Sequence, residues 1–158
     1  MATLDKALEI AAKAHAGQTD RQGQPYILHP IRVMMGVQDE AARIVGILHD
    51  VVEDTAVTLD ELRSEGFSAQ VIESLKRVTH QDGQTYAQYV VQCKSDAVSR
   101  DVKLSDLRDN ANLSRLRLQA NSFDQDSARM HRYALSYQFL TDQISESDYL
   151  RLMGEFEK

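Results

Sequence analysis

The sequence has one cysteine and no tryptophan, and only two of its 158 residues are prolines. A single cysteine cannot form an internal disulfide, and the helical spacing of Cys93 from Tyr86, Tyr89 and Val90 predicts core packing rather than a reactive thiol. The chain has no basic, apolar start resembling a signal peptide and no apolar run near the length of a membrane span. We therefore expect a cytoplasmic protein without a membrane partner.

Basic residues are also outnumbered by acidic ones, 18 to 24. The formal net charge is −6 at pH 7, whereas nucleic-acid-binding domains usually carry a basic surplus. This argues against a nucleic-acid partner, so a phosphate would have to be held by a local cluster of cations or by a metal. The length is typical of one domain with a single core, and residues 1–158 are expected to form that domain. The sequence gives no indication of the oligomeric state.

The stretch around which the chain is organised covers residues 41–54 and reads AARIVGILHDVVED. Apolar residues surround it on almost every side, so it should be buried, and it is interpreted as a helix because no strand-like run exists to pair with it. On a helix, four polar residues crowd one end: His49, Asp50, Glu53 and Asp54. Buried carboxylates are paired, hydrogen-bonded or bound to a metal. The sequence thus predicts a polar site in the core.

Both prolines stand in GQTDRQGQPYILHP, residues 17–30, which is predicted to be a loop. Pro30 suits the first turn of a helix and favours an extended conformation for His29 just before it. Two prolines so close to His29 favour a functional role for it over that of a helix cap. His15 falls on the apolar face of a helix predicted over residues 3–16, and is interpreted as structural rather than as a ligand.

A longer helix is predicted to begin near Ser95 and to contain VKLSDLRDNANL, residues 102–113. Offsets of three and four stack Lys103, Asp106 and Asn110 along one stripe. Alone, this stripe would be an ordinary solvated face, but beside a buried His-Asp pair it is a candidate third wall of a site. Apolar contacts are expected from Val98, Val102, Leu104, Leu107, Ala111 and Leu113.

The other predicted elements are mostly structural. Helices are expected over residues 30–37, after a capping box at Thr58, after a cap at Ser68, through Tyr86 and Cys93, over residues 126–144 with Met130, Ala134, Tyr137 and Phe139 inward, and after Ser145 through Leu150, Met153 and Phe156. A polar break is expected at residues 118–126, and a loop at residues 79–84 in which His80 is exposed to solvent.

Three of these segments, GQTDRQGQPYILHP, LHDVVEDT and VKLSDLRDNANL, occur in that order at family-like separations. Together they resemble the HD superfamily of metal-dependent phosphohydrolases, specifically the hydrolase domain of RelA/SpoT-type alarmone enzymes in its small, stand-alone form. The resemblance covers most of the chain. It implies an all-α fold, a single compact helical HD domain with a metal site in its core, and it leaves no room for the synthetase half of the long bifunctional enzymes.

The resemblance also implies roles for particular residues. The metal ligands would be His29, His49, Asp50 and Asp106, and the ion one divalent metal, expected to be Mn²⁺. Open positions in a six-coordinate shell would suit such an ion better than tetrahedral zinc. The acidic pair that handles the attacking water would be Glu53 and Asp54. Contacts to the substrate would come from Arg21, Tyr26, Lys103, Asn110, Arg129 and Tyr133.

The implied activity is removal of the 3′-diphosphate from guanosine 3′,5′-bis(diphosphate), or a near relative, with release of pyrophosphate. A small phosphorylated nucleotide is therefore the expected partner. The alternatives are an adenosine alarmone, the 2′-phosphate of NADPH, a nucleotide-binding regulatory module without turnover, an antidote to an alarmone-producing toxin, and a helical domain whose buried His and Asp groups merely satisfy each other.

Two departures from the family pattern stand out. The family commonly has arginine, at a position that meets the base, where this chain has Asp20. A carboxylate there accepts hydrogen bonds where arginine donates them, and it repels phosphate. The usual run of aspartate, arginine, leucine, histidine and asparagine becomes Asp106, Leu107, Arg108, Asp109 and Asn110. The expected ligand is kept, but its surroundings change.

Overall fold

The computed structural model describes residues 1–115 and 121–156. Within these ranges the chain is helical, and its only β contact is one antiparallel bridge between Thr19 and Pro25. The helices are α1 (Leu4–Ala14), α2 (Leu28–Met35), α3 (Glu40–Leu48), α4 (Val51–Asp54), α5 (Leu59–Ser64), α6 (Ala69–Val78), α7 (Tyr86–Lys94), α8 (Ala97–Asn110), α9 (Phe123–Leu140) and α10 (Glu146–Phe156). The prediction of an all-α protein is confirmed. None of the described helices is long and apolar enough to cross a membrane.

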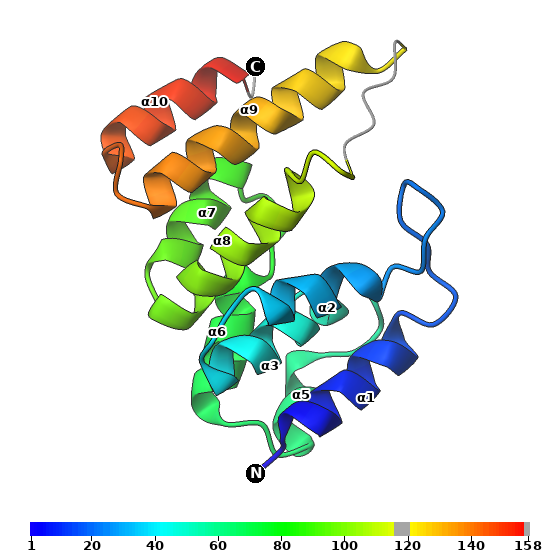
Figure 1. Ribbon diagram of the computed structural model, residues 1–158. Helices are drawn as coiled ribbons and strands as arrows, with labels where there is room; N and C mark the ends of the chain where they lie inside the picture. Colours follow the sequence, from blue (N-terminus) through cyan, green and yellow to red (C-terminus); the bar gives the residue numbers. More distant parts are fainter. Residues whose placement is uncertain (116–120, 157–158) are drawn as a thin grey trace.

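Helix α3 forms most of the segment 41–54 that the sequence predicts to be buried, but the prediction is wrong for Glu53 and Asp54, which are exposed. The helix packs against α1, α2, α6 and α8, and its residues 44–48 are all buried. Gly46 allows a close approach of α2, since a Cβ atom there would stand 3.1 Å from the Met34 Cα atom. In Figure 1, α1, α2 and α3 lie together at the end of the molecule near the N-terminus.

Helix α8 joins this part to the rest of the chain, because it packs against α2, α3, α6, α7 and α9. Its residues 102–107 are buried, including Lys103 and Asp106. Helices α9 and α10 lie side by side at the opposite end of the molecule from α1 (Figure 1), where Phe139 and Tyr149 stack with ring centroids 4.5 Å apart.

The single helix predicted over residues 41–54 is interrupted at His49 and Asp50. Leu48 ends α3, and α4 is one further turn that begins at Val51. At the break, the carbonyl of Gly46 lies 2.8 Å from Nδ1 of the His49 ring. The Gly46 carbonyl therefore has a local side-chain partner at the point where the regular helix ends.

The prediction of an extended His29 is wrong. His29 lies in the first turn of α2, and its backbone N–H donates to the carbonyl of Tyr26 at 2.9 Å. The helix begins two residues before Pro30, and this is tolerated because the first four N–H groups of a helix have no partner within it. His29 is still rigidly held, but by the helix.

Several residues predicted to face inward are exposed. Ala111, Leu113, Ala134 and Leu150 lie on the surface, and Leu113 is 85% exposed. On α9, Ser136 is buried in place of Ala134, and on α10, Tyr149 is buried in place of Leu150. Ala111 and Leu113 lie beyond the end of α8. The predicted break at 118–126 lies outside the described residues at 118–120, and it is wrong for residues 123–126, because α9 begins at Phe123. The side chain of Phe156 also lies outside the described residues.

The local predictions fare better. The capping box of Thr58 and Glu61 is present, and the side chains of Ser68 and Ser145 accept hydrogen bonds from the main chain of the helices that follow them. Cys93 is fully buried and free, and burial raises the pKa of its thiol to about 12. Core packing is therefore confirmed for Cys93.

Candidate metal centre

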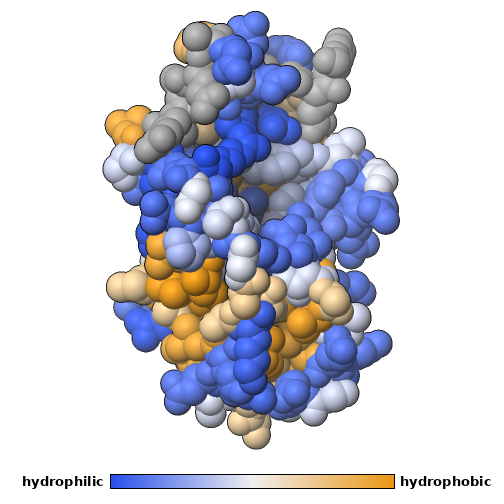
Figure 2. All heavy atoms as spheres, turned by 90° about the vertical axis from the view of Figure 1, so that its right-hand side faces the viewer, coloured by the Kyte–Doolittle hydropathy of each residue, from blue (hydrophilic) through white to orange (hydrophobic). Residues whose placement is uncertain are grey.

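A cavity of about 770 Å³ opens where α2, α4, α7, α8 and α9 meet the loop of residues 19–22. On the face shown in Figure 2, hydrophilic residues gather around a hollow above a more hydrophobic region. Most of the predicted site residues line the cavity: Arg21, Tyr26, His29, His49, Asp50, Glu53, Lys103, Asp106, Asn110, Arg129 and Tyr133. Asp54 lies beside the lining, where it accepts a hydrogen bond from the Tyr26 hydroxyl at 3.4 Å.

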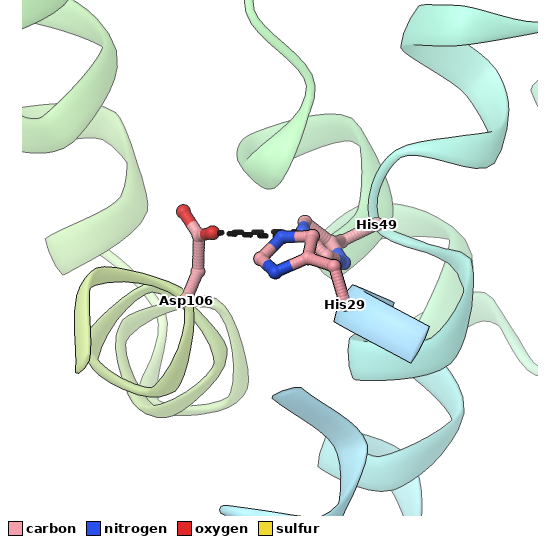
Figure 3. A group of neighbouring side chains, drawn as sticks. All are labelled: His29, His49 and Asp106. Atoms are coloured by element: carbon pink, nitrogen blue, oxygen red, sulfur yellow. Dashed lines mark ion pairs between the residues drawn. The ribbon is translucent and has the colours of Figure 1, made fainter. Parts of the chain in front are cut away.

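At the base of the cavity, three buried side chains from α2, the end of α3 and α8 point toward one another (Figure 3). The possible ligand atoms of His29, His49 and Asp106 all lie within 4.8 Å of one another. His29 Nε2 is 3.2 Å from Asp106 Oδ1, and His49 Nε2 is 3.8 Å from the same oxygen.

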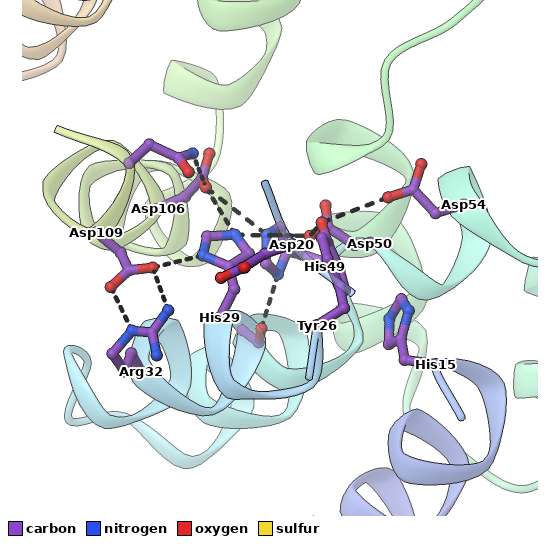
Figure 4. A network of polar contacts seen from close by, with 12 residues as sticks. His15, Asp20, Tyr26, His29, Arg32, His49, Asp50, Asp54, Asp106 and Asp109 are labelled. Atoms are coloured by element: carbon purple, nitrogen blue, oxygen red, sulfur yellow. Dashed lines mark hydrogen bonds and ion pairs between the residues drawn. The ribbon is translucent and has the colours of Figure 1, made fainter. Parts of the chain in front are cut away.

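Asp50 stands at the edge of this group. Its Oδ2 atom is 3.1 Å from His49 Nε2 and 3.6 Å from His29 Nε2. The Tyr26 hydroxyl donates to the same oxygen at 2.6 Å. The structure thus brings together all four residues that the sequence proposes as ligands, from three separate segments of the chain (Figure 4).

The orientation of His49 fits a bound cation. Its Nδ1 lies 2.8 Å from the Gly46 carbonyl, which only accepts, so Nδ1 carries the proton in the neutral ring. The lone pair of Nε2 then faces the oxygens of Asp50 and Asp106, and Nε2 is buried without a hydrogen-bond partner among the described residues. A convergence of acceptors in the interior is unfavourable unless a proton or a metal ion lies between them. Imidazole nitrogens with carboxylate oxygens are also the donor set of divalent transition metals.

Charged neighbours shift the pKa values of His29 and Asp106. Burial alone would lower the pKa of His29, but Asp106 and Asp109 raise it to about 9. Burial would likewise raise the pKa of Asp106, yet the Lys103 ammonium, 2.7 Å from Oδ2, and the two imidazoles hold it far below its usual range. Lys103 is itself buried over the Tyr89 ring, 4.8 Å from the centroid.

The acidic pair of α4 lies at the exposed rim. Burial of part of each side chain and the nearby Asp50 carboxylate raise the pKa values of Glu53 and Asp54. One carboxylate oxygen of Glu53 accepts a hydrogen bond from the backbone N–H of His80 at 2.9 Å. His80 itself is exposed, as predicted, but it also lines the cavity.

The residues predicted to contact substrate occupy different parts of the wall. Asn110 donates to Asp106 Oδ1 at 2.6 Å, so it lies in the inner part of the site and orients the Asp106 carboxylate. Arg129 pairs with the buried Asp126, and the largely exposed Arg21 lies 4.0 Å from the same carboxylate. The two arginines therefore sit at the mouth, joined through Asp126.

His15 stays outside the metal group. It is buried, its Nδ1 lies 2.8 Å from Gln18 Oε1, and its ring centroid is 5.0 Å from that of Tyr26. Its Nε2 is buried without a hydrogen-bond partner among the described residues.

Sequence reasoning missed the roles of Asp109, Arg115 and Asp126. Asp109 Oδ2 lies 2.6 Å from His29 Nδ1, although the two residues are 80 positions apart. Only the spacing of Asp109 from Asp106, one turn along α8, could have indicated a shared site.

Asp20 does not present a free carboxylate. Its Oδ1 accepts from the backbone N–H groups of Gln22 and Gln24, and its Oδ2 lies 3.6 Å from Arg115.

One family model and several known proteins are similar to this chain. A family model described as an HD domain matches residues 7–124. The guanosine-3′,5′-bis(diphosphate) 3′-pyrophosphohydrolase of Borreliella burgdorferi is 44% identical over 81 residues, which cover 49% of this chain and 12% of that protein. The Aquifex aeolicus protein of the same name is 29% identical over 119 residues, covering 68% of this chain and 17% of that protein.

A GTP pyrophosphokinase of Myxococcus xanthus is 40% identical over 80 residues, covering 48% of this chain and 10% of that protein. The matched region therefore spans less than a fifth of any of these three relatives. A solved structure described as a metazoan ortholog of SpoT that hydrolyzes ppGpp superposes with a TM-score of 0.69, covering 98% of this chain and 97% of that one. Its sequence identity is 20%, so this likeness establishes a common fold.

Proposed function

Because this chain belongs to the HD domain family, we propose that it is a metal-dependent phosphohydrolase that removes the 3′-diphosphate from guanosine 3′,5′-bis(diphosphate) and releases pyrophosphate. The observation that carries the proposal is the convergence of two buried imidazoles and two aspartates at the base of a cavity. The names of the Borreliella burgdorferi and Aquifex aeolicus relatives supply the substrate. We also propose that residues 1–158 act as one HD domain.

In this proposal, His29, His49, Asp50 and Asp106 hold one divalent ion, and we expect Mn²⁺. Such an ion, when bound, lowers the pKa of a coordinated water and polarises a phosphoryl oxygen. The Tyr26 phenol donates to Asp50 and stays protonated, because burial and that carboxylate raise its pKa. Asn110 and Lys103 both donate to Asp106 and fix its two oxygens.

Glu53 and Asp54 serve as proton acceptors for the attacking water. The water oxygen bonds to the phosphorus that is attached to the 3′-oxygen. The bond between this phosphorus and the 3′-oxygen breaks, and the 3′-oxygen leaves with a proton. A carboxylate whose pKa is raised takes up a proton more readily than an ordinary one, and both residues meet this condition. Arg21 and Arg129 at the mouth, with Tyr133, supply contacts for the nucleotide and its phosphates.

A substrate panel with Mn²⁺ tests the proposal. Guanosine 3′,5′-bis(diphosphate), its adenosine counterpart and NADPH are each incubated with the protein, and pyrophosphate and phosphate are measured separately. We expect pyrophosphate from the guanosine compound. Phosphate from NADPH alone would overturn the substrate assignment, and nucleotide binding without any product would overturn the enzyme assignment.

The ligand set is tested by Asp106→Asn, which changes the shape of the site little but removes one negative ligand. We expect the variant to lose retained metal and at least about a hundredfold in kcat/KM. Asp101→Asn, an exposed aspartate on the same helix, is the matched control and should retain both. An active Asp106→Asn protein free of metal would refute the site.

A further inference from the structure

The two nitrogens of the His29 ring have different surroundings. Nε2 faces Asp106 and Asp50, at 3.2 and 3.6 Å. Nδ1 faces the other way, toward Asp109 Oδ2 at 2.6 Å. Asp109 belongs to α8, one turn after Asp106, and is 7% exposed. One helix thus supplies a carboxylate on each side of the same imidazole, as Figure 4 shows.

Asp109 is itself held on several sides. Arg32 Nε donates to Oδ1 at 2.6 Å, and Arg32 Nη2 donates to Oδ2 at 3.2 Å. Arg115 Nη1 donates to Oδ2 and, at 3.0 Å, to the backbone carbonyl of Asp109. Two guanidinium groups therefore hold the Asp109 carboxylate in place as an acceptor.

We propose that Asp109 is a positioning residue that orients His29 as a metal ligand, with Arg32 and Arg115 holding Asp109 in place. The inference rests on the metal centre of the proposed function. A carboxylate can only accept, so with His29 neutral it keeps the proton on Nδ1 and leaves the lone pair of Nε2 directed at Asp106 and Asp50. Partners behind a ligating histidine fix its tautomer and ring orientation and raise its basicity.

The second imidazole supports this assignment by comparison. The Nδ1 atom of His49 is fixed by the Gly46 carbonyl at 2.8 Å, so its Nε2 also faces the cluster. The two histidines are therefore oriented in the same sense by two different acceptors, a main-chain carbonyl for His49 and a charged side chain for His29. Only the second acceptor can be removed by substitution.

Arg115 extends the arrangement to the cavity wall. Its guanidinium lies 3.6 Å from Asp20 Oδ2, and its backbone carbonyl accepts a hydrogen bond from the Gln22 side chain. Residues 19–22 line the cavity. Through Arg115, Asp109 therefore connects the proposed ligand His29 to the cavity loop of residues 19–22.

The test compares Mn²⁺ affinity, measured by calorimetric titration, in wild type, Asp109→Asn and Asp101→Asn. We expect Asp109→Asn to raise the Kd for Mn²⁺ by about 10- to 100-fold and Asp101→Asn to leave it within about twofold of wild type. Arg115→Gln should have a smaller effect than Asp109→Asn, because Arg32 still holds Asp109. Circular dichroism and thermal melts establish that each variant is folded.

A second measurement separates orientation from general stability. In protein loaded with Zn²⁺ as a diamagnetic probe, the proton on His29 Nδ1 should give a strongly downfield resonance. Asp109→Asn should remove or shift this resonance, while that of His49 Nδ1–H, bonded to Gly46, should persist in every variant and serves as an internal control.

The outcomes are distinguishable. A wild-type affinity together with an unchanged His29 resonance in Asp109→Asn would overturn the role of Asp109 and leave the metal centre standing. A wild-type protein that binds neither Mn²⁺ nor Zn²⁺ would overturn both. Weakened Mn²⁺ binding, together with loss of the His29 resonance and retention of the His49 resonance, would support the inference.

Discussion

Glu53 shows how the environment of one residue changes its chemistry. Its carboxyl group is partly buried, and Asp50 and Asp54 lie close enough to disfavour a further negative charge, so its pKa is raised. The backbone N–H of His80 opposes this effect by stabilising the carboxylate. A carboxylate accepts a proton only above its pKa, so an enzyme that uses Glu53 as base loses activity as the pH falls through that raised value.

We therefore expect Glu53→Gln to lower kcat/KM by about 10²- to 10⁴-fold. The acid limb of the wild-type pH profile should lie at higher pH than an ordinary glutamate would give, and it should disappear in the residual activity of the variant. Steady-state kinetics across the pH range measure both effects. Glu155→Gln on α10 is the control. An unchanged acid limb in Glu53→Gln would assign the proton transfer to another group, with Asp54 the next to be tested.

At the scale of elements, α8 carries much of the site, and its position depends on how it begins. The side chain of Asp96 caps the helix by accepting from the Ser99 N–H at 2.9 Å. It also accepts from the Ser74 hydroxyl on α6 at 2.8 Å, which fixes the start of α8 against a neighbouring helix. Burial alone would raise the pKa of Asp96, but hydrogen bonds from the Ser99 hydroxyl at 2.7 Å, the Ser99 N–H and the Ser74 hydroxyl lower it.

Asp96→Ala should destabilise the protein by about 1–2 kcal/mol near neutral pH. A lowered folded-state pKa stabilises the protein above the unfolded-state value, and this contribution is lost as the pH falls through the folded-state value. The deficit of the variant should therefore stay constant from about pH 7 down to about pH 4 and shrink only below that pH, as measured by urea unfolding. Asp101→Ala on the same helix is the control. A deficit that stays constant at lower pH as well would contradict the cap's ionic character.

At the scale of the whole molecule, the candidate site is formed by residues from several separate segments of the chain. His29 comes from α2, His49 and Asp50 from the break between α3 and α4, and Asp106 from α8. The loop of residues 19–22 and α9 complete the cavity wall. Because an ion bound there would link segments that are far apart in the chain, it would bind the folded state and not the unfolded one.

Metal binding should accordingly stabilise the fold. At Mn²⁺ concentrations about 100 times the Kd, the gain is about 2.7 kcal/mol, which for a chain of this size raises the Tm by about 5–10 °C. A chelator should reverse the rise, and His49→Gln should abolish it, whereas Asp101→Asn should keep it. Differential scanning calorimetry measures the shifts. An equal rise in His49→Gln would mean that the metal binds elsewhere.

The sequence by itself determined the helical class, the buried run of residues 44–49 and the caps at Thr58, Ser68 and Ser145. These features depend on residues a few positions apart, and local periodicity and capping chemistry act over that range. The proposed ligands and substrate contacts also came from the sequence, through motifs whose order resembles a known family, and the fold brings nearly all of them to one cavity.

Only the tertiary structure decided the break at His49, the exposure of Leu113 and the role of Asp109. Asp109 and His29 are 80 positions apart, and no local pattern indicates that a particular carboxylate will meet a particular imidazole. Which side of a helix end is buried, and which polar groups become partners, depends on how whole helices pack. Burial makes such pairing obligatory, because a polar group removed from water must find a partner inside the fold.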